Sequence, residues 1–354
     1  MTATSPGGPP VEPATDSSAA PDGPLLEVRG LRVEFSTHAG TVRAVNGVSL
    51  SVRRGETLAI VGESGSGKTV TALSIMGLVD RPGSITGGEI VFEGVALQTL
   101  PEREYRRFRG GDLAMIFQDP LSSLNPAFRV GDQIAEALLQ HSYDAKSAAR
   151  RQAAHLLDIV GIPQAADRAR DYPHQLSGGM RQRAMIAMAI ANKPALLIAD
   201  EPTTALDVTI QAQVLEVLRA AQAETNAALL LITHDLGIVA GMADRIVVMY
   251  AGRIVEEGDL DEIFSRSRHP YTLGLLGSLP RLDSDRRKPL PTIPGTPPSL
   301  LRLPPGCALA PRCPYVVDHC REERPELDVV EVGTGHRSAC WRAAELPELE
   351  AAKR

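Results

Sequence analysis

The chain has 354 residues, of which 43% are hydrophobic and 23% are charged, the ordinary balance of a protein with a sizeable buried core. Its formal net charge of -6 gives no basic surface for nucleic acid, so we expect no nucleic-acid partner. No apolar run approaches the ~20 residues that span a bilayer, and the N-terminus lacks the basic and apolar regions of a secretory signal. We therefore expect a cytoplasmic protein.

The first elements predict a strand, a glycine-rich loop and a helix. Residues 1–24 are rich in Pro, Gly, Ser, Ala and Thr, which predicts a disordered tail. Apolar and polar residues alternate over 25–35 and again over 41–52, as they do in half-buried strands. Residues 57–61 form a short apolar run that ends at a glycine and predicts a buried strand. Residues 69–78 then predict a helix.

The second half of the chain predicts an α/β fold with an insertion. Residues 110–175 are mostly Ala, Leu, Arg and Gln at helical spacing, apart from the apolar run 114–117, and predict a helical subdomain of about 110–180. Continuous apolar runs then predict strands that are buried on both faces, with helical segments between them. The strands are expected at 195–199, 227–233 and 245–249, and the helices at 209–223 and 236–242.

Residues 62–69 match the pattern G-x-x-x-x-G-K-[ST] of a phosphate-binding loop. Glycine lets backbone N–H groups turn toward phosphates without a clashing Cβ. Lys68 would reach the β- and γ-oxygens, and Thr69 would offer its hydroxyl to Mg²⁺. An ordinary strand-to-helix turn is the alternative, which the flanking strand and helix disfavour. The nucleotide-binding residues expected here are Gly62, Glu63, Ser64, Gly65, Ser66, Gly67, Lys68 and Thr69.

Polar side chains stand where the later strands end, at the edge where α/β proteins bind ligands. Asp200 would orient Mg²⁺, and Glu201 would polarise the attacking water. Gln118 follows the run 114–117, where an amide can bind Mg²⁺ or the water. His234 can hydrogen-bond a γ-phosphate. Each residue taken singly is more often structural than catalytic, so their order along the chain carries the prediction.

A second glycine-rich loop, residues 176–183 with the sequence LSGGMRQR, opens a predicted helix. A helix N-terminus offers free N–H groups and partial positive charge, so this loop can also hold anionic oxygens. The chain thus has two phosphate-binding surfaces. Along residues 25–260 the chain carries, in this order, the phosphate loop, Gln118, the Ser-Gly-Gly loop, Asp200-Glu201, Ala205-Leu206-Asp207 and His234. This order resembles that of an ATP-binding cassette (ABC) ATPase.

The resemblance implies an α/β P-loop NTPase (RecA-like) fold with an antiparallel β subdomain and the helical insertion. In that family two cassettes pack head to tail with two ATP molecules between them. Ser177, Gly178, Gly179 and Asp207 would then serve the nucleotide of a partner. Glu201, His234 and Gln118 would be catalytic, and Mg²⁺ would be held through Thr69, Gln118 and Asp200. The family stacks an aromatic residue on adenine just before the second strand. Here residues 38–42 contain no Phe, Tyr or Trp, and the nearest candidates are Phe35 and His38.

Several further stretches resemble the ATPase subunits of bacterial dipeptide and oligopeptide importers. They are residues 118–126, 176–188, 269–272 and 294–298, and Met180 in place of the usual Gln resembles the "D" member of two paired ATPases. The resemblance implies a cassette over 25–258, an importer-type extension over 259–354, and a peripheral position on the cytoplasmic face of the cell membrane. The implied partners are a second ATPase, two permease subunits and, indirectly, an extracytoplasmic peptide-binding protein.

Two alternatives stay open at this point. The same importer role could serve another cargo, such as nickel, opines or glutathione. A soluble cassette ATPase without a transporter is the other, but such proteins carry two cassettes or long coiled coils. This chain has one cassette and no heptad run.

All four cysteines lie near the C-terminus, as Cys307-x5-Cys313-x6-Cys320-x19-Cys340, after a proline-rich stretch at 289–305 that predicts an extended linker. Reducing conditions in the cytoplasm argue against disulfides. Zinc sites usually show tight C-x2-C pairs, whereas four thiolates can also hold an iron–sulfur cluster. The resemblance implies a [4Fe–4S] cluster on these four residues, with zinc and free thiols as alternatives. His319 and His336 are expected to be exposed to solvent.

Overall fold

The computed structural model describes residues 23–119, 123–141, 145–204, 206–279 and 292–351. Almost all of the expected disordered tail therefore lies outside the described residues. The strands are β1 (Leu26–Thr37), β2 (Gly40–Val52), β3 (Thr57–Val61), β4 (Gly83–Phe92), β5 (Val95–Ala96), β6 (Leu113–Ile116), β7 (Leu196–Asp200), β8 (Ala228–Thr233), β9 (Arg245–Tyr250), β10 (Arg253–Asp259), β11 (Asp328–Val329) and β12 (Arg337–Ser338).

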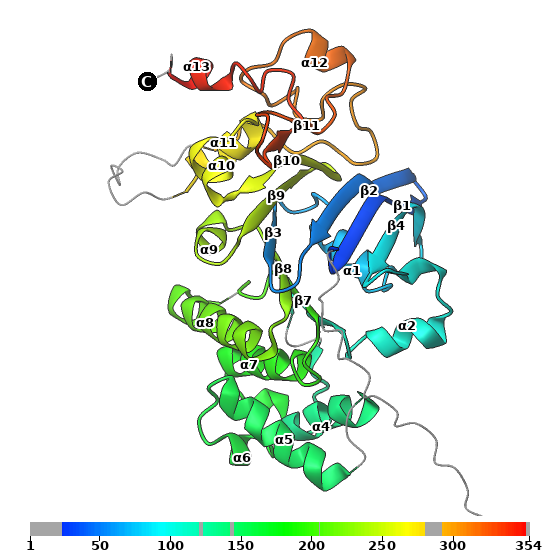
Figure 1. Cartoon of the computed structure of the whole chain (residues 1–354), viewed down its shortest axis with the longest axis vertical. Coiled ribbons are helices and arrows are strands. Elements are labelled where there is room, and N and C mark those ends of the chain that lie inside the picture. The colour runs from blue at the N-terminus through cyan, green and yellow to red at the C-terminus, as the bar shows by residue number, and fades with distance from the viewer. Residues whose placement is uncertain (1–22, 120–122, 142–144, 205, 280–291, 352–354) are drawn as a thin grey trace, which may run out of the picture.

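Helices follow the strands in an α/β order over most of the chain (Figure 1). They are α1 (Lys68–Ile75), α2 (Glu102–Phe108), α4 (Val130–His141), α5 (Lys146–Ile159), α6 (Ala165–Arg168), α7 (Gly178–Ala189), α8 (Val208–Thr225), α9 (Leu236–Ala240), α10 (Leu260–Ser265), α11 (Pro270–Gly277), α12 (His319–Glu322) and α13 (Leu346–Ala351), with 3-10 turns at Leu97–Thr99 and Pro173–Gln175.

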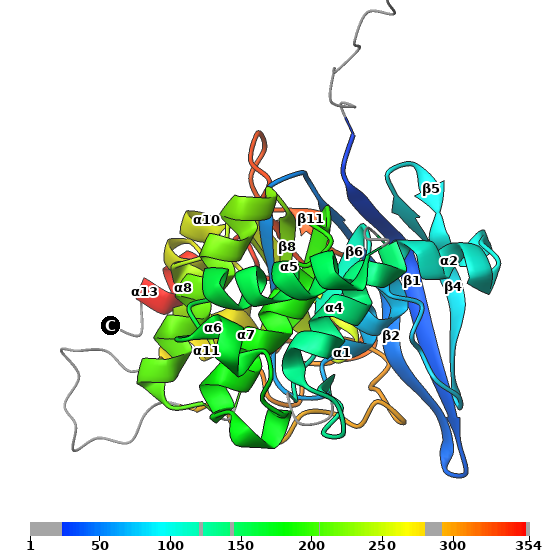
Figure 2. The same cartoon turned by 90° about the horizontal axis from the view of Figure 1, so that it is seen from below.

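The described strands form two sheets. The larger has the order β11-β12-β10-β9-β3-β8-β7-β6, and its strands β9, β3, β8, β7 and β6 run parallel. The smaller, β2-β1-β4-β5, is antiparallel and stands as a separate layer beside the helices (Figure 2). The expected α/β fold with an antiparallel subdomain is confirmed, and the parallel strands bring their carboxyl ends to one edge.

The central strand β3 is buried on both faces, as its unbroken apolar run predicts. Successive side chains of a strand point to opposite faces. Leu58 and Ile60 therefore pack into the core beneath the antiparallel sheet, whereas Ala59 and Val61 pack against the C-terminal part of the chain. This burial on both faces fixes the position of Gly62, the residue after β3, where the glycine-rich loop begins.

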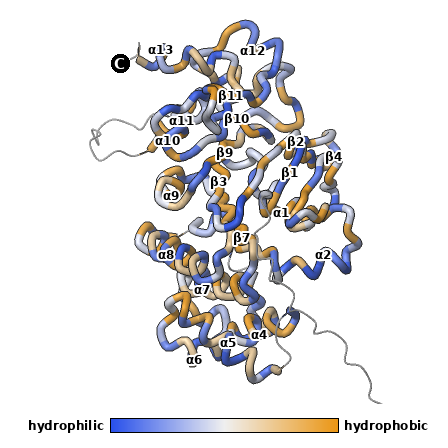
Figure 3. Tube along the Cα trace, in the orientation of Figure 1, coloured by the Kyte–Doolittle hydropathy of each residue, from blue (hydrophilic) through white to orange (hydrophobic). Residues whose placement is uncertain are grey.

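Helices α4 to α7 form the helical subdomain at one end of the molecule (Figure 1). Ile134 and Leu138 lie one turn apart on α4, and Ala149, Ala153 and Leu157 repeat that spacing on α5. All five are buried in one core with α7. Helices α4 and α5 accordingly carry both hydrophobic and hydrophilic residues in Figure 3, whereas α2 is largely hydrophilic.

The described residues of the C-terminal extension, 259–279 and 292–351, cover the opposite end of the molecule (Figure 1). The extension joins the large sheet through β12, which pairs with β10. Glu256 of β10 is fully buried, and its carboxylate accepts hydrogen bonds from Ser267 Oγ at 3.0 Å and lies 2.8 Å from His336 Nε2. The expectation that His336 is exposed was therefore wrong, because its imidazole is the buried partner of this carboxylate. The side chain of His319 is 49% exposed, as expected.

Candidate nucleotide-binding site

The phosphate loop, residues 62–69, connects β3 to α1, and its backbone leaves no room for larger residues at two positions. A Cβ on Gly62 would lie 2.2 Å from the carbonyl oxygen of Met249. Gly67 has a φ of 104° at the N-cap of α1, and a Cβ there would lie 2.5 Å from the carbonyl oxygen of Ala44. Glycine is required at both positions because only glycine avoids these clashes and adopts that φ without strain.

Lys68 folds back over this loop. Its Nζ donates hydrogen bonds to the carbonyl oxygens of Gly62, at 2.7 Å, and of Glu63, at 3.1 Å. The same Nζ lies 3.9 Å from Glu201 Oε1. Burial lowers the pKa of the Lys68 ammonium, while the charges of Glu201, Asp200 and Glu63 act in the opposite direction. The ammonium is thus held in the loop by groups that a phosphate oxygen can replace.

A buried hydroxyl in the same loop has no partner. Ser66 Oγ is inaccessible to solvent, and no described residue forms a hydrogen bond with it. Buried polar atoms in native proteins are almost always paired, so this hydroxyl is available as a donor to a ligand in the loop. A phosphate oxygen in the loop would supply that partner.

The loop meets β7 through a hydroxyl and a carboxylate. Thr69 Oγ1 donates a hydrogen bond of 3.1 Å to Asp200 Oδ1, and Asp200 is only 2% exposed at the end of the strand. Burial raises the pKa of Asp200, and the Thr69 hydrogen bond partly offsets this rise. Both groups are hard oxygen donors, the kind of ligand that Mg²⁺ prefers, so the expected Mg²⁺ residues Thr69 and Asp200 fit that ion.

Glu201, beyond β7, contacts side chains that follow the ends of β6 and β8. Gln118 Nε2, beyond β6, donates to Glu201 Oε2 at 3.0 Å, and Thr204 Oγ1 donates to the same oxygen at 2.8 Å. His234 Nδ1, beyond β8, lies 3.4 Å from Glu201 Oε1. The structure therefore brings Gln118, Glu201 and His234 together as the sequence predicts.

The backbone of Glu201 is strained. Its φ of 46° lies in the left-handed region that residues with a side chain rarely adopt, and its N–H donates to the carbonyl oxygen of Ile232 at 2.8 Å. Such a conformation costs on the order of 1–3 kcal/mol and persists where surrounding contacts impose it. Strained residues of this kind gather at active sites, and here the strain aims a carboxylate at the phosphate loop.

An open cleft of about 610 Å³ lies here, and its lining includes Gly62, Lys68, Thr69, Gln118, Glu201 and His234. Neither Phe35 nor His38 is among its lining residues, so the adenine candidates named from the sequence do not lie there. Phe35 packs instead against Gly83 and Val79 in the core. Apolar side chains at the cleft come from Ala44, from Leu275 of α11 and from Leu300. No local pattern singled out these last two residues, because only the fold of the C-terminal extension brings them to the cleft.

The second glycine-rich loop lies elsewhere. Ser177 caps α7, its Oγ accepting the N–H of Met180 at 3.3 Å, and Gly179 packs so closely that a Cβ would lie 2.8 Å from Ile210 of α8. Asp207 caps α8 by accepting two N–H bonds of 3.1 Å. Of the expected set Ser177, Gly178, Gly179 and Asp207, none lines the cleft at the phosphate loop. The chain does not bring its two phosphate-binding surfaces together.

The four cysteines gather in the C-terminal extension without forming a ready metal centre. The N–H of Cys307 donates to the carbonyl oxygen of Cys320 at 2.8 Å. Burial raises the pKa of the Cys340 thiol to about 12, and the charges of Cys313, Cys307 and Cys320 add to the rise. In the part of the chain that the structure describes, no three His, Cys, Asp or Glu side chains are grouped so that they could hold a metal ion.

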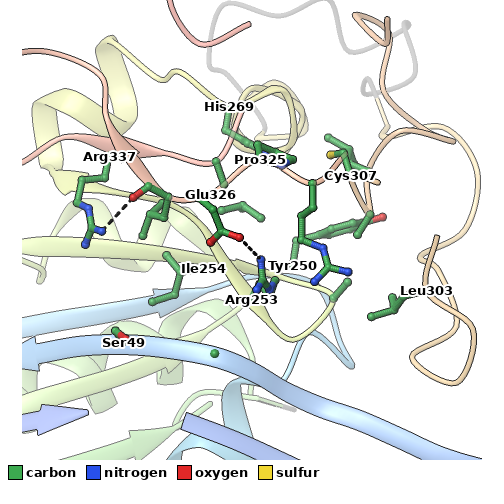
Figure 4. A pocket seen from close by; sticks show the side chains of 18 residues that line it. Ser49, Tyr250, Arg253, Ile254, His269, Leu303, Cys307, Pro325, Glu326 and Arg337 are labelled. Atoms are coloured by element: carbon green, nitrogen blue, oxygen red, sulfur yellow. Dashed lines mark hydrogen bonds and ion pairs between the residues drawn. The ribbon is translucent and has the colours of Figure 1, made fainter. Parts of the chain in front are cut away.

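A second cavity, of about 230 Å³, lies between β2, β10 and the extension (Figure 4). Tyr250, His269 and Cys307 line it, together with Arg253, whose guanidinium lies 3.7 Å from the carboxylate of Glu326. It shares no lining residue with the cleft at the phosphate loop. The nucleotide is expected in the cleft, because the phosphate loop lines that cleft and not this cavity. None of the described helices is long and apolar enough to cross a membrane.

The geometry defines a P-loop nucleotide-binding site, and comparisons with known proteins identify the family. The family described as "ABC transporter" matches residues 45–204, and "Oligopeptide/dipeptide transporter, C-terminal region" matches residues 255–320. The oligopeptide transport ATP-binding protein OppD of Bacillus subtilis is 52% identical, over 92% of this chain and 91% of its own length. The chain belongs to the ABC transporter family, in its branch of oligopeptide and dipeptide transport ATP-binding proteins.

Other relatives differ in length or resemble only the cassette. The OppD protein of Mycobacterium tuberculosis is 53% identical over 90% of this chain, yet the chain spans only 52% of that relative's length. Among solved structures, the dimeric ABC transporter cassette MJ0796 matches with a TM-score of 0.60 and 26% identity, over 67% of this chain and 99% of that one. The cassette part of the fold is thus shared with a known dimer.

Proposed function

We propose that this chain is the ATP-hydrolysing subunit of a bacterial ABC importer and drives the uptake of oligopeptides or dipeptides through membrane permease subunits. The observation that carries the proposal is the meeting of Thr69, Asp200, Glu201, Gln118 and His234 at one sheet edge beside the phosphate loop. The peptide cargo is inferred from relatives such as the oligopeptide and dipeptide transport ATP-binding proteins OppD and DppD of Bacillus subtilis.

The phosphate loop binds the triphosphate. Its backbone N–H groups and the unpaired hydroxyl of Ser66 donate hydrogen bonds to phosphate oxygens. Lys68 exchanges its bonds to the carbonyl oxygens of Gly62 and Glu63 for bonds to the β- and γ-oxygens. Because the ammonium is already buried and paired with acceptors, it needs little reorganisation to stabilise the charge that develops in the transition state.

Thr69 and Asp200 would hold Mg²⁺, with Gln118 completing the set. The ion would neutralise charge on the phosphate oxygens. Glu201 acts as the general base: its carboxylate accepts a proton from the attacking water, while Gln118 and Thr204 fix its orientation. His234, whose side chain is 60% exposed, faces the open cleft and hydrogen-bonds the γ-phosphate.

Ser177, Gly178 and Gly179 serve the ATP of a second cassette packed head to tail. Two observations support this arrangement: these residues do not line the chain's own cleft, and they begin a helix of 12 residues whose N-terminus attracts anions. Asp207 caps the neighbouring helix α8, whose Ile210 lies against Gly179. Hydrolysis removes the bridging γ-phosphate and weakens the interface, so that chemistry is converted into motion.

The helical subdomain would receive the permease. A membrane fractionation experiment tests the proposed place of the chain on the cytoplasmic face of the membrane. The chain is expected in the membrane fraction when the permease subunits are co-expressed, and in the supernatant without them. A chain that remains in the supernatant in both cases, while hydrolysing ATP, would instead fit a soluble cassette ATPase.

The cargo is tested separately, because the binding protein and the permeases choose it. Uptake of a labelled peptide supports the proposal, whereas uptake of nickel, an opine or glutathione alone would leave the ATPase role and change the cargo.

We further propose that Cys307, Cys313, Cys320 and Cys340 bind a structural [4Fe–4S] cluster, with zinc as the alternative. The support is the residue set: the four cysteines lie between residues 307 and 340 of one extension, and four thiolates can hold such a cluster. In the described residues their side chains are not grouped as a metal site, so cluster binding would have to bring them together. No step of ATP hydrolysis involves these residues. Iron analysis and absorbance near 400 nm on anaerobically purified protein test the proposal, and zinc without iron would contradict the cluster.

A further inference from the structure

Described residues of the C-terminal extension form hydrogen bonds with Glu63 of the phosphate loop. The N–H of Glu63 donates a hydrogen bond of 2.8 Å to the hydroxyl of Tyr271, 208 residues later in the chain. The carboxylate of Glu63 accepts two bonds from Arg312, Nη1 to Oε2 at 2.9 Å and Nη2 to Oε1 at 3.1 Å, across 249 residues. Both the backbone and the side chain of Glu63 are therefore held from outside the cassette.

Arg312 is fully occupied in this position. Its Nε donates to the carbonyl oxygen of Pro294 at 2.9 Å, and its Nη atoms donate also to Tyr250 Oη at 3.2 Å and to the carbonyl oxygen of Ile293 at 3.4 Å. With the two bonds to Glu63, these use all five donors of the guanidinium. The side chain is 4% exposed. Because all five donors of the planar guanidinium are bonded, Arg312 is held in the orientation that binds the carboxylate of Glu63.

Tyr271 is equally well placed. It is the second residue of α11, it has no exposed surface, and its ring packs against that of Tyr250 with the centroids 4.6 Å apart. The buried hydroxyl cannot move away from the loop without disturbing this pair. Tyr271 therefore fixes the N–H of Glu63, as Arg312 fixes its carboxylate.

Glu63 passes this constraint on to the rest of the loop. Its carbonyl oxygen accepts the 3.1 Å bond from Lys68 Nζ and a 3.2 Å bond from the N–H of Ser66. A rotation of the Glu63 peptide would break both bonds and displace two groups that contact the phosphates. The conformation of the phosphate loop thus depends on residues of the extension.

Charge adds a second effect. The carboxylate of Glu63 belongs to a loop that receives a triphosphate, and an unpaired negative charge there opposes ATP binding. The bidentate pair with Arg312 offsets that charge. Removing Arg312 would therefore free the loop and at the same time expose a like charge to the phosphates.

We propose that Arg312 and Tyr271 are positioning residues for ATP binding, through which the C-terminal extension sets the nucleotide affinity of the phosphate loop. The inference rests on the proposed ATP-binding function. If docking of the extension on Glu63 raises the affinity for ATP, then bound ATP must equally stabilise the docked extension, because such coupling is reciprocal. The extension is then a support of the nucleotide site as well as a part of the fold.

The test is a titration of the purified full-length chain with Mg-ATP. We expect Arg312→Gln to raise the Kd by about tenfold, or ~1.4 kcal/mol, because Glu63 loses its counter-charge. The double variant Glu63→Gln with Arg312→Gln should recover most of the affinity, since no unpaired carboxylate remains. Arg342→Gln is the matched control, because Arg342 lies in the same extension but pairs with Glu345 at 2.7 Å and not with the loop.

Tyr271→Phe removes one hydroxyl and keeps the buried ring, so it tests the inference even if Arg312→Gln does not fold. It should raise the Kd for ATP about threefold, because the N–H of Glu63 loses its hydrogen-bond partner. ATP should slow proteolysis of the extension in the unmodified chain, but not in Arg312→Gln. Folded variants that bind ATP like the unmodified chain would overturn the inference. Failure of the unmodified chain to bind ATP would instead overturn the proposed function.

Discussion

Replacing Glu201 by Gln removes the proposed general base and little else. Oε2 of Glu201 accepts bonds from Gln118 and Thr204, and an amide oxygen can accept the same two bonds. The new NH₂ group replaces Oε1, which lies 3.4 Å from His234 Nδ1 and 3.9 Å from Lys68 Nζ. Since the side chains are equal in size, the phosphate loop is undisturbed, and ATP affinity should change little.

The rate should change greatly. Loss of a general base commonly costs about 10²–10⁴-fold, which corresponds to roughly 2.7–5.5 kcal/mol in the activation barrier. ATP would bind and close the head-to-tail dimer, but the γ-phosphate would remain. We therefore expect the Glu201→Gln chain to accumulate as an ATP-bound dimer.

The assay is phosphate release by the complex of this chain with the proposed partner ATPase and permeases. A complex in which this chain carries Lys68→Ala gives the background rate, because the phosphate that it still releases comes from the partner's site. Glu224→Gln, an exposed change on α8, is the matched control and should keep the full rate. Turnover by Glu201→Gln at about the control rate would refute the role of Glu201 as a base.

Three further predictions concern the ion, the partner site and acid stability. Asp200→Asn should raise the Mg²⁺ concentration needed for half-maximal hydrolysis by roughly tenfold, measured as phosphate release at fixed ATP; an unchanged Mg²⁺ dependence would contradict the role of Asp200. Ser177→Arg should keep this chain's own ATP affinity but abolish the ATP-dependent dimer, as seen by size-exclusion chromatography. Burial lowers the pKa of His269 to about 4, below its ordinary 6.5, so the unfolded state binds the proton first as pH falls. The free energy of unfolding should therefore drop by roughly 3 kcal/mol between pH 6.5 and 4. His269→Asn keeps an acceptor for the N–H of Tyr271 and should flatten this dependence in thermal unfolding.

The nucleotide site could be predicted from the sequence because its signals are local. The strand at 57–61 and the glycines that follow are adjacent in the chain, and so are the apolar residues of β7 and the pair Asp200 and Glu201. Parallel strands bring their carboxyl ends to one edge whatever the loops between them do. The meeting of Gln118, Glu201 and His234 follows from that rule.

Some elements of the fold were missed because their sequences carry conflicting signals. β4 contains Gly83, Gly87 and Gly88, which suggest turns, yet Phe35 fills the space above Gly83. β10 contains Glu256 and Glu257 at buried positions, which no strand pattern predicts.

Ion pairs from distant parts of the chain explain that burial. His336 contacts Glu256, and Arg245 Nη2 lies 2.6 Å from Glu257 Oε1. Contacts of this kind, like that between Arg312 and Glu63, depend on tertiary packing and leave no trace in local sequence.

Peptide uptake by proteoliposomes that contain this chain, the proposed partner ATPase and the permeases is the most direct test that ATP hydrolysis by this chain drives peptide import. ATP is supplied on the side of the ATPases, and a labelled peptide with its binding protein on the other. We predict that peptide accumulates only with Mg-ATP and that Glu201→Gln stops the accumulation while ATP still binds. Uptake at the full rate with Glu201→Gln, or steady ATP hydrolysis by the unmodified complex that moves no peptide, would contradict the account.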